Sequence, residues 1–437
     1  MKSLNLTSCL LLLLLSLLAA PLAADEGETE RPDEETSAVI EEDTADDETP
    51  ATEAQVESPT ETGAKTASAS DDDAAQTFTL LNNDVAPGSM RRLSWYASEN
   101  SAGLSEATPV LVAHGVNAGP TLCVTAAVHG DELNGVEIVR NLLYDVDPER
   151  LNGTIIGVPI VNLYGFRLGS RYLSDRRDLN RYFPGNPDGS SASRIAYSLF
   201  ESVIKHCDYL VDLHTGSFQR VNMPQLRADL NNDDVLRMTK GFGATVILHG
   251  EGPDGSLRGA ATRAGIPAVT VEAGEPMRVQ SEQVEHGLKA LRSLLNYLDM
   301  VPRFSLWGEP QPIYYKSEWV RAEDNGILTS SVNLGDTVDE GELLGTIVDP
   351  ITNSRNAIHS PVAGRVIGMA LNQSMRPGYA AYHIGIRKTE EQIVEEADLA
   401  IDDTDKTRDR DNESESDESD EQDTAAVDVP PDTEATE

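Results

Sequence analysis

The stretch Val128-His129-Gly130-Asp131-Glu132 decides how the rest of the sequence is interpreted. It follows residues 121–128, a run of small and apolar residues that predicts a buried strand, and an apolar pattern of helical spacing begins at Leu133. His129 and Glu132, three residues apart where a strand turns into a helix, can both reach one cation. Zinc suits this mixture of imidazole nitrogen and carboxylate oxygen, and a catalytic zinc site needs one more protein ligand and an open position for water.

We expect the third ligand at the end of another strand in the same sheet. The best candidate is His214, because the apolar run that starts at Tyr209 ends there in the polar turn Thr215-Gly216. An isolated HxxE pair occurs by chance on many solvated helix starts. Two polar clusters at two strand ends are hard to explain by packing, so together they favour a metal site.

The sequence between residues 77 and 300 alternates short apolar runs with helical patterns. The predicted strands are 109–113, 121–128, 154–161, 209–213, 244–248 and 268–271. The predicted helices are 133–144, 193–206, 233–242 and 282–299. Several runs are apolar at consecutive positions, which suits strands covered on both faces. The alternation predicts an α/β domain with a mostly parallel sheet, helices on both faces and ligand-bearing loops at the carboxyl ends of the strands.

The loop at residues 171–185 follows the third predicted strand and concentrates arginines near Asn180 and Arg181. A guanidinium binds a carboxylate through two parallel hydrogen bonds, and a neighbouring Asn adds a donor without adding charge. In an otherwise acidic protein this cationic cluster predicts an anion pocket. The alternative is a loop whose charges pair with the acidic surface of the protein itself.

The predicted strand 268–271 ends directly in Glu272, with Gly274 just beyond. A carboxylate at a strand end in a zinc site is suited to act as general base for water and then to protonate the leaving nitrogen. Glu275 is the competing choice, but it lies beyond the glycine and we expect it to face solvent.

Four features together resemble the succinylglutamate desuccinylase/aspartoacylase family, which is related to the zinc carboxypeptidases: HGDE at 129–132, DLNR at 178–181, DLHTG at 212–216 and Glu272. The resemblance covers residues 77–385. It implies a zinc-carboxypeptidase-like fold with one Zn²⁺ ion per chain.

The resemblance also implies roles for single residues. It makes His129, Glu132 and His214 the zinc ligands and Glu272 the base that activates water. It makes Asn180 and Arg181 the clamp on the free carboxylate of the substrate.

The family also has an Arg upstream of DLNR that stabilises the oxyanion. Arg171 matches it best through Arg-Tyr, but its spacing to Asn180 is longer than in aspartoacylases, so Arg176 stays open. Arg258 is a further candidate for substrate contact.

The remaining histidines have no carboxylate at ligand spacing on a predicted strand end. We interpret them as surface or hydrogen-bonded structural residues. They are His114, His206, His249, His286, His359 and His383.

Residues 301–388 differ in sequence pattern from the preceding part of the chain. Short stretches rich in Gly, Val and Ile alternate with turn signals, and this pattern predicts a small β domain. Residues 335–344 and 360–366 resemble a lipoyl/biotinyl-like barrel-sandwich. A swinging-arm carrier needs a Lys between those halves, and the sequence has none from Trp319 to Arg387. The resembling family has a similar β domain beside the active-site mouth, which implies a wall that limits substrate size.

The ends of the 437-residue chain differ in composition from the middle. Residues 1–24 hold one Lys, an apolar run too short to span a bilayer and then small residues, which predicts a signal peptide and a soluble exported protein, placed in the periplasm. Residues 25–76 and 389–437 carry most of the excess acid behind a formal charge of −40, and we expect both to be disordered. Such charge argues against nucleic acids and anionic membranes as partners, whereas a small molecule or short peptide fits.

Cys9 belongs to the predicted signal peptide, whereas Cys123 and Cys207 lie in apolar surroundings. An exported setting permits a disulfide, but a core of this size does not need one. We therefore expect two buried thiols.

Three functions from different classes fit these features. The first is a zinc-dependent deacylase that cleaves an amide or ester bond in a small carboxylate-bearing substrate such as an N-acyl amino acid. The second is a metallocarboxypeptidase or amidase acting on peptides or cell-wall fragments. The third, a non-catalytic binding protein on the same fold, has no need of Glu272. The acyl group, the amine and the oligomeric state stay open.

Overall fold

The structure is a computed structural model that describes residues 74–97, 106–302, 312–371 and 373–386. The predicted signal peptide, the acidic tail at 389–437 and the acidic segment at 25–76, apart from its last three residues, lie outside the described residues. Among the described helices, none has both the length and the apolar composition needed to cross a membrane.

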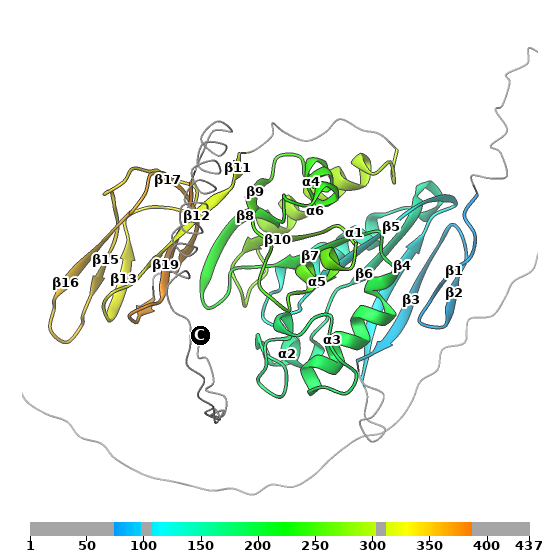
Figure 1. Cartoon of the computed structure of the whole chain (residues 1–437), viewed down its shortest axis with the longest axis horizontal. Coiled ribbons are helices and arrows are strands. Elements are labelled where there is room, and N and C mark those ends of the chain that lie inside the picture. The colour runs from blue at the N-terminus through cyan, green and yellow to red at the C-terminus, as the bar shows by residue number, and fades with distance from the viewer. Residues whose placement is uncertain (1–73, 98–105, 303–311, 372, 387–437) are drawn as a thin grey trace, which may run out of the picture. The chain divides into compact units, whose positions relative to one another are not determined.

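A 13-stranded mixed sheet dominates the structure (Figure 1). Its four central strands are adjacent and parallel: β6 (Asn152–Val158), β5 (Asn117–Ala126), β7 (Tyr209–His214) and β10 (Ala268–Gly274). Beyond β6, β4 (Ala107–His114) pairs antiparallel with β6, and β3 (Ser89–Tyr96) pairs antiparallel with β4. Beyond β10, β8 (Arg220–Ala228) pairs antiparallel with β10. Parallel pairs continue from β8 to β9 (Val246–His249) and β11 (Ile313–Tyr314). The predicted mixed α/β fold with a parallel centre is confirmed.

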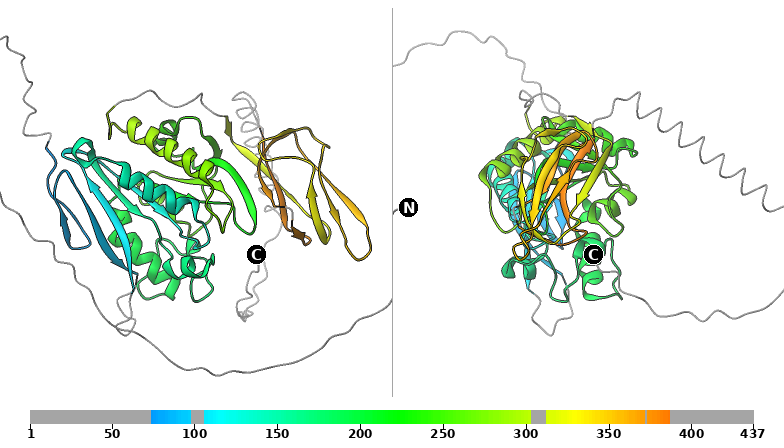
Figure 2. Two further views of the ribbon diagram at one scale, coloured as in Figure 1. Left: turned by 180° about the vertical axis from the view of Figure 1, so that it is seen from behind. Right: turned by 90° about the vertical axis from the view of Figure 1, so that its left-hand side faces the viewer.

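Helices cover both faces of the sheet. One face packs against α1 (Asn134–Asp145), α4 (Asp233–Thr239) and α6 (Ser281–Tyr297), and the other against α3 (Ser191–Ser202) and α5 (Leu257–Arg263). The helices α1 and α6 lie side by side over the central strands (Figure 2). All four predicted helices and all six predicted strands have counterparts, although two predicted helices end in short 3-10 turns.

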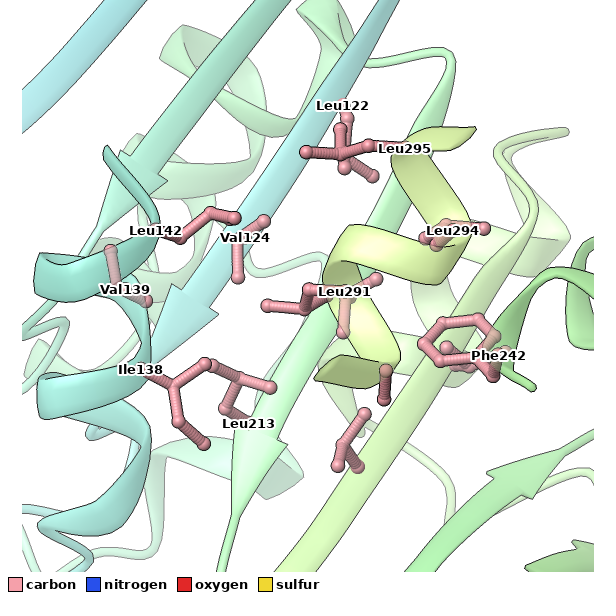
Figure 3. Close-up of a cluster of buried hydrophobic side chains, with 14 of the residues drawn as sticks. Leu122, Val124, Ile138, Val139, Leu142, Leu213, Phe242, Leu291, Leu294 and Leu295 are labelled. Atoms are coloured by element: carbon pink, nitrogen blue, oxygen red, sulfur yellow. The ribbon is translucent and has the colours of Figure 1, made fainter. Parts of the chain in front are cut away.

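Apolar periodicity explains why α1 lies where it does. Its residues Ile138, Val139 and Leu142 recur at helical spacing and pack against Val124 and other side chains of the central strands (Figure 3). Fully burying one such side chain contributes roughly 1.5–3 kcal/mol. This packing fixes the start of α1, and with it Glu132, against the end of β5.

The prediction of two buried thiols is wrong, because Cys123 and Cys207 form a disulfide with Cα atoms 5.7 Å apart. The reason is strand pairing. Cys123 lies in β5 opposite Leu210 of β7, and Cys207 lies just before β7. Parallel pairing of two strands that are distant in sequence therefore brings the two sulfur atoms together, which spacing alone does not reveal.

The C-terminal region is built of strands, as predicted. Its elements are β12 (Lys316–Arg321), β13 (Gly326–Ser330), β14 (Thr337–Val338), β15 (Leu343–Val348), β16 (Arg355–His359), β17 (Gly364–Ala370), β18 (Ser374–Met375) and β19 (Ala380–Ile386). Strands β16, β15, β13 and β18 form a separate four-stranded sheet. Strands β12, β19 and β17 extend the large sheet, because β17 pairs antiparallel with β8. Because of this pairing, β12 and β19 lie close to the candidate active site.

Candidate active site

Three of the predicted site residues converge on one point. The Nδ1 atom of His129 lies 2.8 Å from Oε1 of Glu132, and Nδ1 of His214 lies 2.7 Å from Oε2 of the same carboxylate. The two Nδ1 atoms are 3.2 Å apart. All three residues are buried, and their ligand atoms fall within 4.8 Å of one another. Among the described residues, this is the cluster able to hold a metal ion.

Local backbone geometry places these side chains at one edge of the sheet. The chain leaves β5 through Ala127, which has a φ of +47°, and His129 follows two residues later. A Cβ atom on Gly130 would lie 2.0 Å from the backbone carbon of Gly165, so only glycine allows the loop to pass α2 (Leu163–Leu168). His214 ends the adjacent strand β7. The carboxyl ends of parallel neighbours therefore bring the HGDE and DLHTG segments together.

Each imidazole of the cluster is oriented by a second carboxylate. Nε2 of His214 donates to Oδ2 of Asp212 at 2.7 Å, and Nε2 of His129 donates to Oδ1 of Asp178 at 3.1 Å. A proton held on Nε2 leaves the Nδ1 lone pair directed into the cluster, which is the arrangement of metal-binding histidines. The donor set and its orientation therefore fit a zinc ion with an open fourth position.

The cluster also compensates its own charge. Burial by itself raises the pKa of Glu132, but His129 and His214 outweigh burial and hold that pKa well below its usual range. Burial lowers the pKa of His214, whereas Asp212 and Glu132 raise it well above its ordinary value. The carboxylate is thus ionised at neutral pH, as cation binding requires.

Arg171 lies directly beside the cluster. Its Nη1 donates to Oε1 of Glu132 at 3.2 Å, and its Nη2 donates to Oδ2 of Asp178 at 2.8 Å. Arg176 is exposed and does not line the cavity that contains the cluster. Of the two arginines that the sequence left open, the structure places Arg171 at the site.

The DLNR segment lines the same cavity through Asn180 and Arg181. Oδ1 of Asn180 accepts a hydrogen bond from the backbone N–H of Leu257 at 2.8 Å, so the side-chain amide is oriented with its NH₂ group available as a donor. Nη1 of Arg181 donates to the backbone oxygen of Asn180 at 2.9 Å. The two side chains are therefore held as neighbouring donors.

Glu272 lies on β10 in register with His214 of β7 and lines the cavity. Its Oε2 accepts a hydrogen bond from Nδ2 of Asn222 at 2.9 Å, and its Oε1 lies 3.2 Å from Nε of Arg227. The expectation that Glu275 faces solvent is wrong. Its side chain is buried and paired with an arginine away from the cavity, because the chain folds back after β10.

The cavity has a volume of about 350 Å³, and part of its wall was not predicted from the sequence. The unpredicted part includes Arg220, Asn222 and Arg227 of β8, together with Ser317, Trp319, His249 and His383. Strand β8 was missed because RVNMPQLRA mixes charged, polar and apolar residues without clear alternation. The two histidines are hydrogen-bonded, as expected, but they also face the cavity. No short motif marks these positions. Arg258, which the sequence offered as a further candidate for substrate contact, lines the cavity as well.

The fold and the site together define a class of protein: an α/β domain with a His-Glu-His cluster at the ends of parallel strands, beside a carboxylate and arginines. Residues 118–298 match the family of the succinylglutamate desuccinylase/aspartoacylase catalytic domain. This match, together with the relatives below, supports the assignment of residues 118–298 to this deacylase family.

Named relatives agree with this assignment. The chain is 28% identical over 244 residues to the N-alpha-acetyl-L-2,4-diaminobutyric acid deacetylase of Halomonas elongata, a match that covers 53% of this chain and 71% of the relative. A succinylglutamate desuccinylase from Silicibacter sp. TM1040 has a similar structure, with a TM-score of 0.61 and 25% identity over 68% of this chain and 93% of the other. The product-bound ectoine utilization protein EutE (DoeB) of Ruegeria pomeroyi gives a TM-score of 0.62 and 26% identity, with 68% and 95% covered.

Proposed function

We propose that this chain is a zinc-dependent deacylase that hydrolyses the amide bond of a small N-acyl amino acid. The observation that carries the proposal is the convergence of His129, Glu132 and His214 in one cavity with the carboxylate of Glu272. The deacetylase relative supports amide hydrolysis as the reaction. Export to the periplasm is part of the same proposal, and it rests on residues 1–24, which lie outside the described residues.

The metal would be held by His129, Glu132 and His214. When bound, zinc supplies Lewis-acid polarisation of the scissile carbonyl and lowers the pKa of water. Asp178 and Asp212 keep the two imidazoles oriented for that purpose through the hydrogen bonds on Nε2.

Two charged side chains carry out the chemistry beside the metal. Glu272 takes the proton from the attacking water and passes it to the departing nitrogen, and Asn222 orients its carboxylate. Arg171, fixed by Glu132 and Asp178, donates to the oxygen on which negative charge develops.

Binding of the substrate depends on Asn180 and Arg181, whose donors receive its free carboxylate. A cavity of about 350 Å³ is at the lower end of ligand sites, which favours a small molecule over an extended peptide.

The decisive experiment compares Glu272→Gln with the matched control Glu275→Gln, which changes a nearby carboxylate outside the cavity. We expect one zinc per chain in both variants, and a kcat for N-acetyl amino acids that falls by about 10²–10⁴-fold in Glu272→Gln alone. Metal analysis and a panel of N-acyl amino acids and short peptides provide the readout. Unchanged turnover in Glu272→Gln, or folded protein that binds no zinc, would refute the proposal. Faster cleavage of peptides would favour a carboxypeptidase.

A further inference from the structure

The guanidinium of Arg171 is held along its edges and on one face. Its N–H groups, which lie in the guanidinium plane, donate to Glu132 and Asp178. The ring of Phe218 covers the face, with 5.3 Å from Cζ of Arg171 to the ring centroid. Hydrogen bonds in the plane fix where the group lies, whereas a contact on the face limits its tilt. The tilt decides where the donors of Arg171 point.

The contact with Phe218 differs from the hydrogen bonds because it is independent of the metal cluster. Oε1 of Glu132 and Oδ1 of Asp178 also contact the two ring nitrogens of His129, at 2.8 Å and 3.1 Å. A bound cation would draw on the same Glu132 carboxylate that receives Arg171. The ring of Phe218 offers no ligand atom to zinc, so its contact with Arg171 does not compete with metal binding.

Phe218 lies in the tight loop between His214 and β8. Its φ is +54°, and that of Gln219 is +57°. Residues other than glycine rarely adopt this left-handed region, so two of them in succession carry backbone strain. A Cβ atom on Gly216 would lie 2.2 Å from the backbone oxygen of Arg220, so the loop folds closely on itself. Such a conformation persists only where the surrounding structure holds it.

The β domain supplies contacts that hold the loop. The hydroxyl group of Tyr379 donates to the backbone oxygen of Phe218. The backbone N–H of Leu371 donates to the backbone oxygen of Gln219 at 3.0 Å, and Nε2 of Gln373 donates to the same oxygen at 3.3 Å. Nε2 of Gln373 also lies 3.2 Å from the Tyr379 hydroxyl oxygen. The carbonyl groups of both strained residues are therefore bonded to the β domain.

Burial does not explain an aromatic side chain at this position, because Phe218 is 46% exposed. Its ring instead lies against two cations, Arg171 on one side and Arg220, whose Cζ is 5.8 Å from the ring centroid. The same Cζ atom is 5.8 Å from the centroid of Tyr379. An aromatic face attracts a cation, so Arg220 links the ring of the loop to the ring of the β domain.

We propose that Phe218 is a positioning residue for Arg171 and that the β domain holds Phe218 in place through Tyr379. The proposal rests on the proposed function, in which Arg171 donates to the oxygen on which negative charge develops. The β domain then contributes to the rate of the chemical step in addition to forming a wall of the cavity. Because Asn180 and Arg181 bind the substrate, kcat rather than KM should depend on Phe218.

The first test uses the zinc-loaded full chain and the preferred substrate, meaning the N-acyl amino acid with the highest kcat/KM in the panel. Phe218→Leu removes the ring but keeps an apolar side chain. We expect kcat to fall about 10-fold while KM changes less than about twofold, because the donor is misplaced but the substrate clamp is intact. Phe218→Tyr retains the ring and should restore kcat to within about twofold of the unmodified chain.

A double-mutant cycle shows whether Phe218 acts through Arg171. In a chain that already carries Arg171→Gln, the guanidinium is absent and Phe218→Leu has nothing left to misplace. We expect the second substitution to lower kcat by less than about twofold there, against about 10-fold in the unmodified background. A general disturbance of the loop would lower kcat equally in both backgrounds, and that result would overturn the proposal.

Tyr379→Phe tests the hold of the β domain without touching the loop. It removes the hydroxyl group that donates to Phe218 and keeps the ring. We expect kcat to fall about 3–10-fold with KM nearly unchanged, the size of one hydrogen bond. Tyr144→Phe, at an exposed position on α1, is the matched control and should change neither constant. Equal kcat in Tyr379→Phe and the control would overturn the role of the β domain.

The outcomes separate this proposal from the proposed function. An unchanged kcat in Phe218→Leu would overturn the positioning role and leave the deacylase assignment standing. Loss of zinc from Phe218→Leu would place its effect on His214 and would also overturn the role. If the unmodified chain hydrolysed no N-acyl amino acid, the deacylase assignment would fail. Urea unfolding then tests the contact: shifts of the midpoint in Phe218→Leu and Arg171→Gln that do not add support it, and additive shifts overturn it.

Discussion

The two sides of the cavity differ in how their charges are balanced. On the metal side, the imidazoles of His129 and His214 contact carboxylates at both ring nitrogens. On the opposite, cationic side, Arg220 and Arg258 donate hydrogen bonds to backbone oxygens, and the guanidinium of Arg220 also lies over the ring of Trp319. The carboxylates of the protein therefore balance the metal side, whereas no ion pair with a described carboxylate balances Arg220 or Arg258.

The largest effect on activity is expected from removing one of the predicted metal ligands. His214→Ala removes one of three ligands and the imidazole that contacts Oε2 of Glu132, leaving that oxygen the hydrogen bond from the backbone N–H of Thr215. We expect zinc content to fall well below one per chain and kcat/KM to drop at least about 10³-fold, because the Lewis acid contributes several kcal/mol. Metal analysis and single-substrate kinetics measure both.

His359→Ala, at an exposed histidine, is the control and should retain zinc and activity. Full zinc occupancy in His214→Ala would show that the cluster is not the metal site.

The same contrast explains which parts of the site sequence analysis could find. His214 is the last residue of β7, and Glu272 lies two residues before the end of β10. His129 and Glu132 follow the end of β5, and the short apolar runs in the sequence predict where these strands end. The rule that ligands gather at the carboxyl ends of parallel strands then brings these residues together without further information.

The cationic side could not be found in this way. Arg220 and His383 lie on antiparallel strands far apart in the sequence, and Arg227 reaches the cavity through a one-residue bulge that no residue pattern marks. Their proximity depends on the pairing of β17 with β8, which is a tertiary contact. The disulfide was missed for the same reason, since it depends on the pairing of β5 with β7.

The disulfide allows the scaffold under the metal side to be tested separately from its ligands. Cys123 and Cys207 close a loop across a sequence separation of 84. In the chain-entropy model, replacing both with Ala lowers the free energy of unfolding by about 4.5 kcal/mol. Urea unfolding measures the change, and zinc content at low denaturant should stay at one per chain. Equal stability of the oxidised protein and the double variant would contradict this expectation.

A smaller effect should come from the carboxylates that orient the imidazoles. Asp212→Asn keeps the size of the side chain but removes the negative charge that faces Nε2 of His214. We expect zinc affinity to fall about 10–100-fold, as for other outer partners of metal ligands. Competition with a chelator of known affinity measures it. Asp234→Asn, at an exposed helix position, is the control, and equal affinity in both variants would exclude a positioning role for Asp212.

The smallest effect is expected from the wall that the β domain contributes. Trp319 stacks on His383 and lies under the guanidinium of Arg220, with 5.2 Å from its Cζ to the ring centroid. Trp319→Leu removes the stacking while keeping an apolar side chain. Because each such contact contributes only about 1 kcal/mol, we expect KM for the preferred substrate to rise up to about 10-fold, with zinc content and kcat nearly unchanged. Tyr144→Leu, at an exposed position on α1, should change neither constant. A large fall in kcat with unchanged KM in Trp319→Leu would mean that this wall acts on the chemistry at the metal side, and the division of the cavity into two independent halves would have to be abandoned.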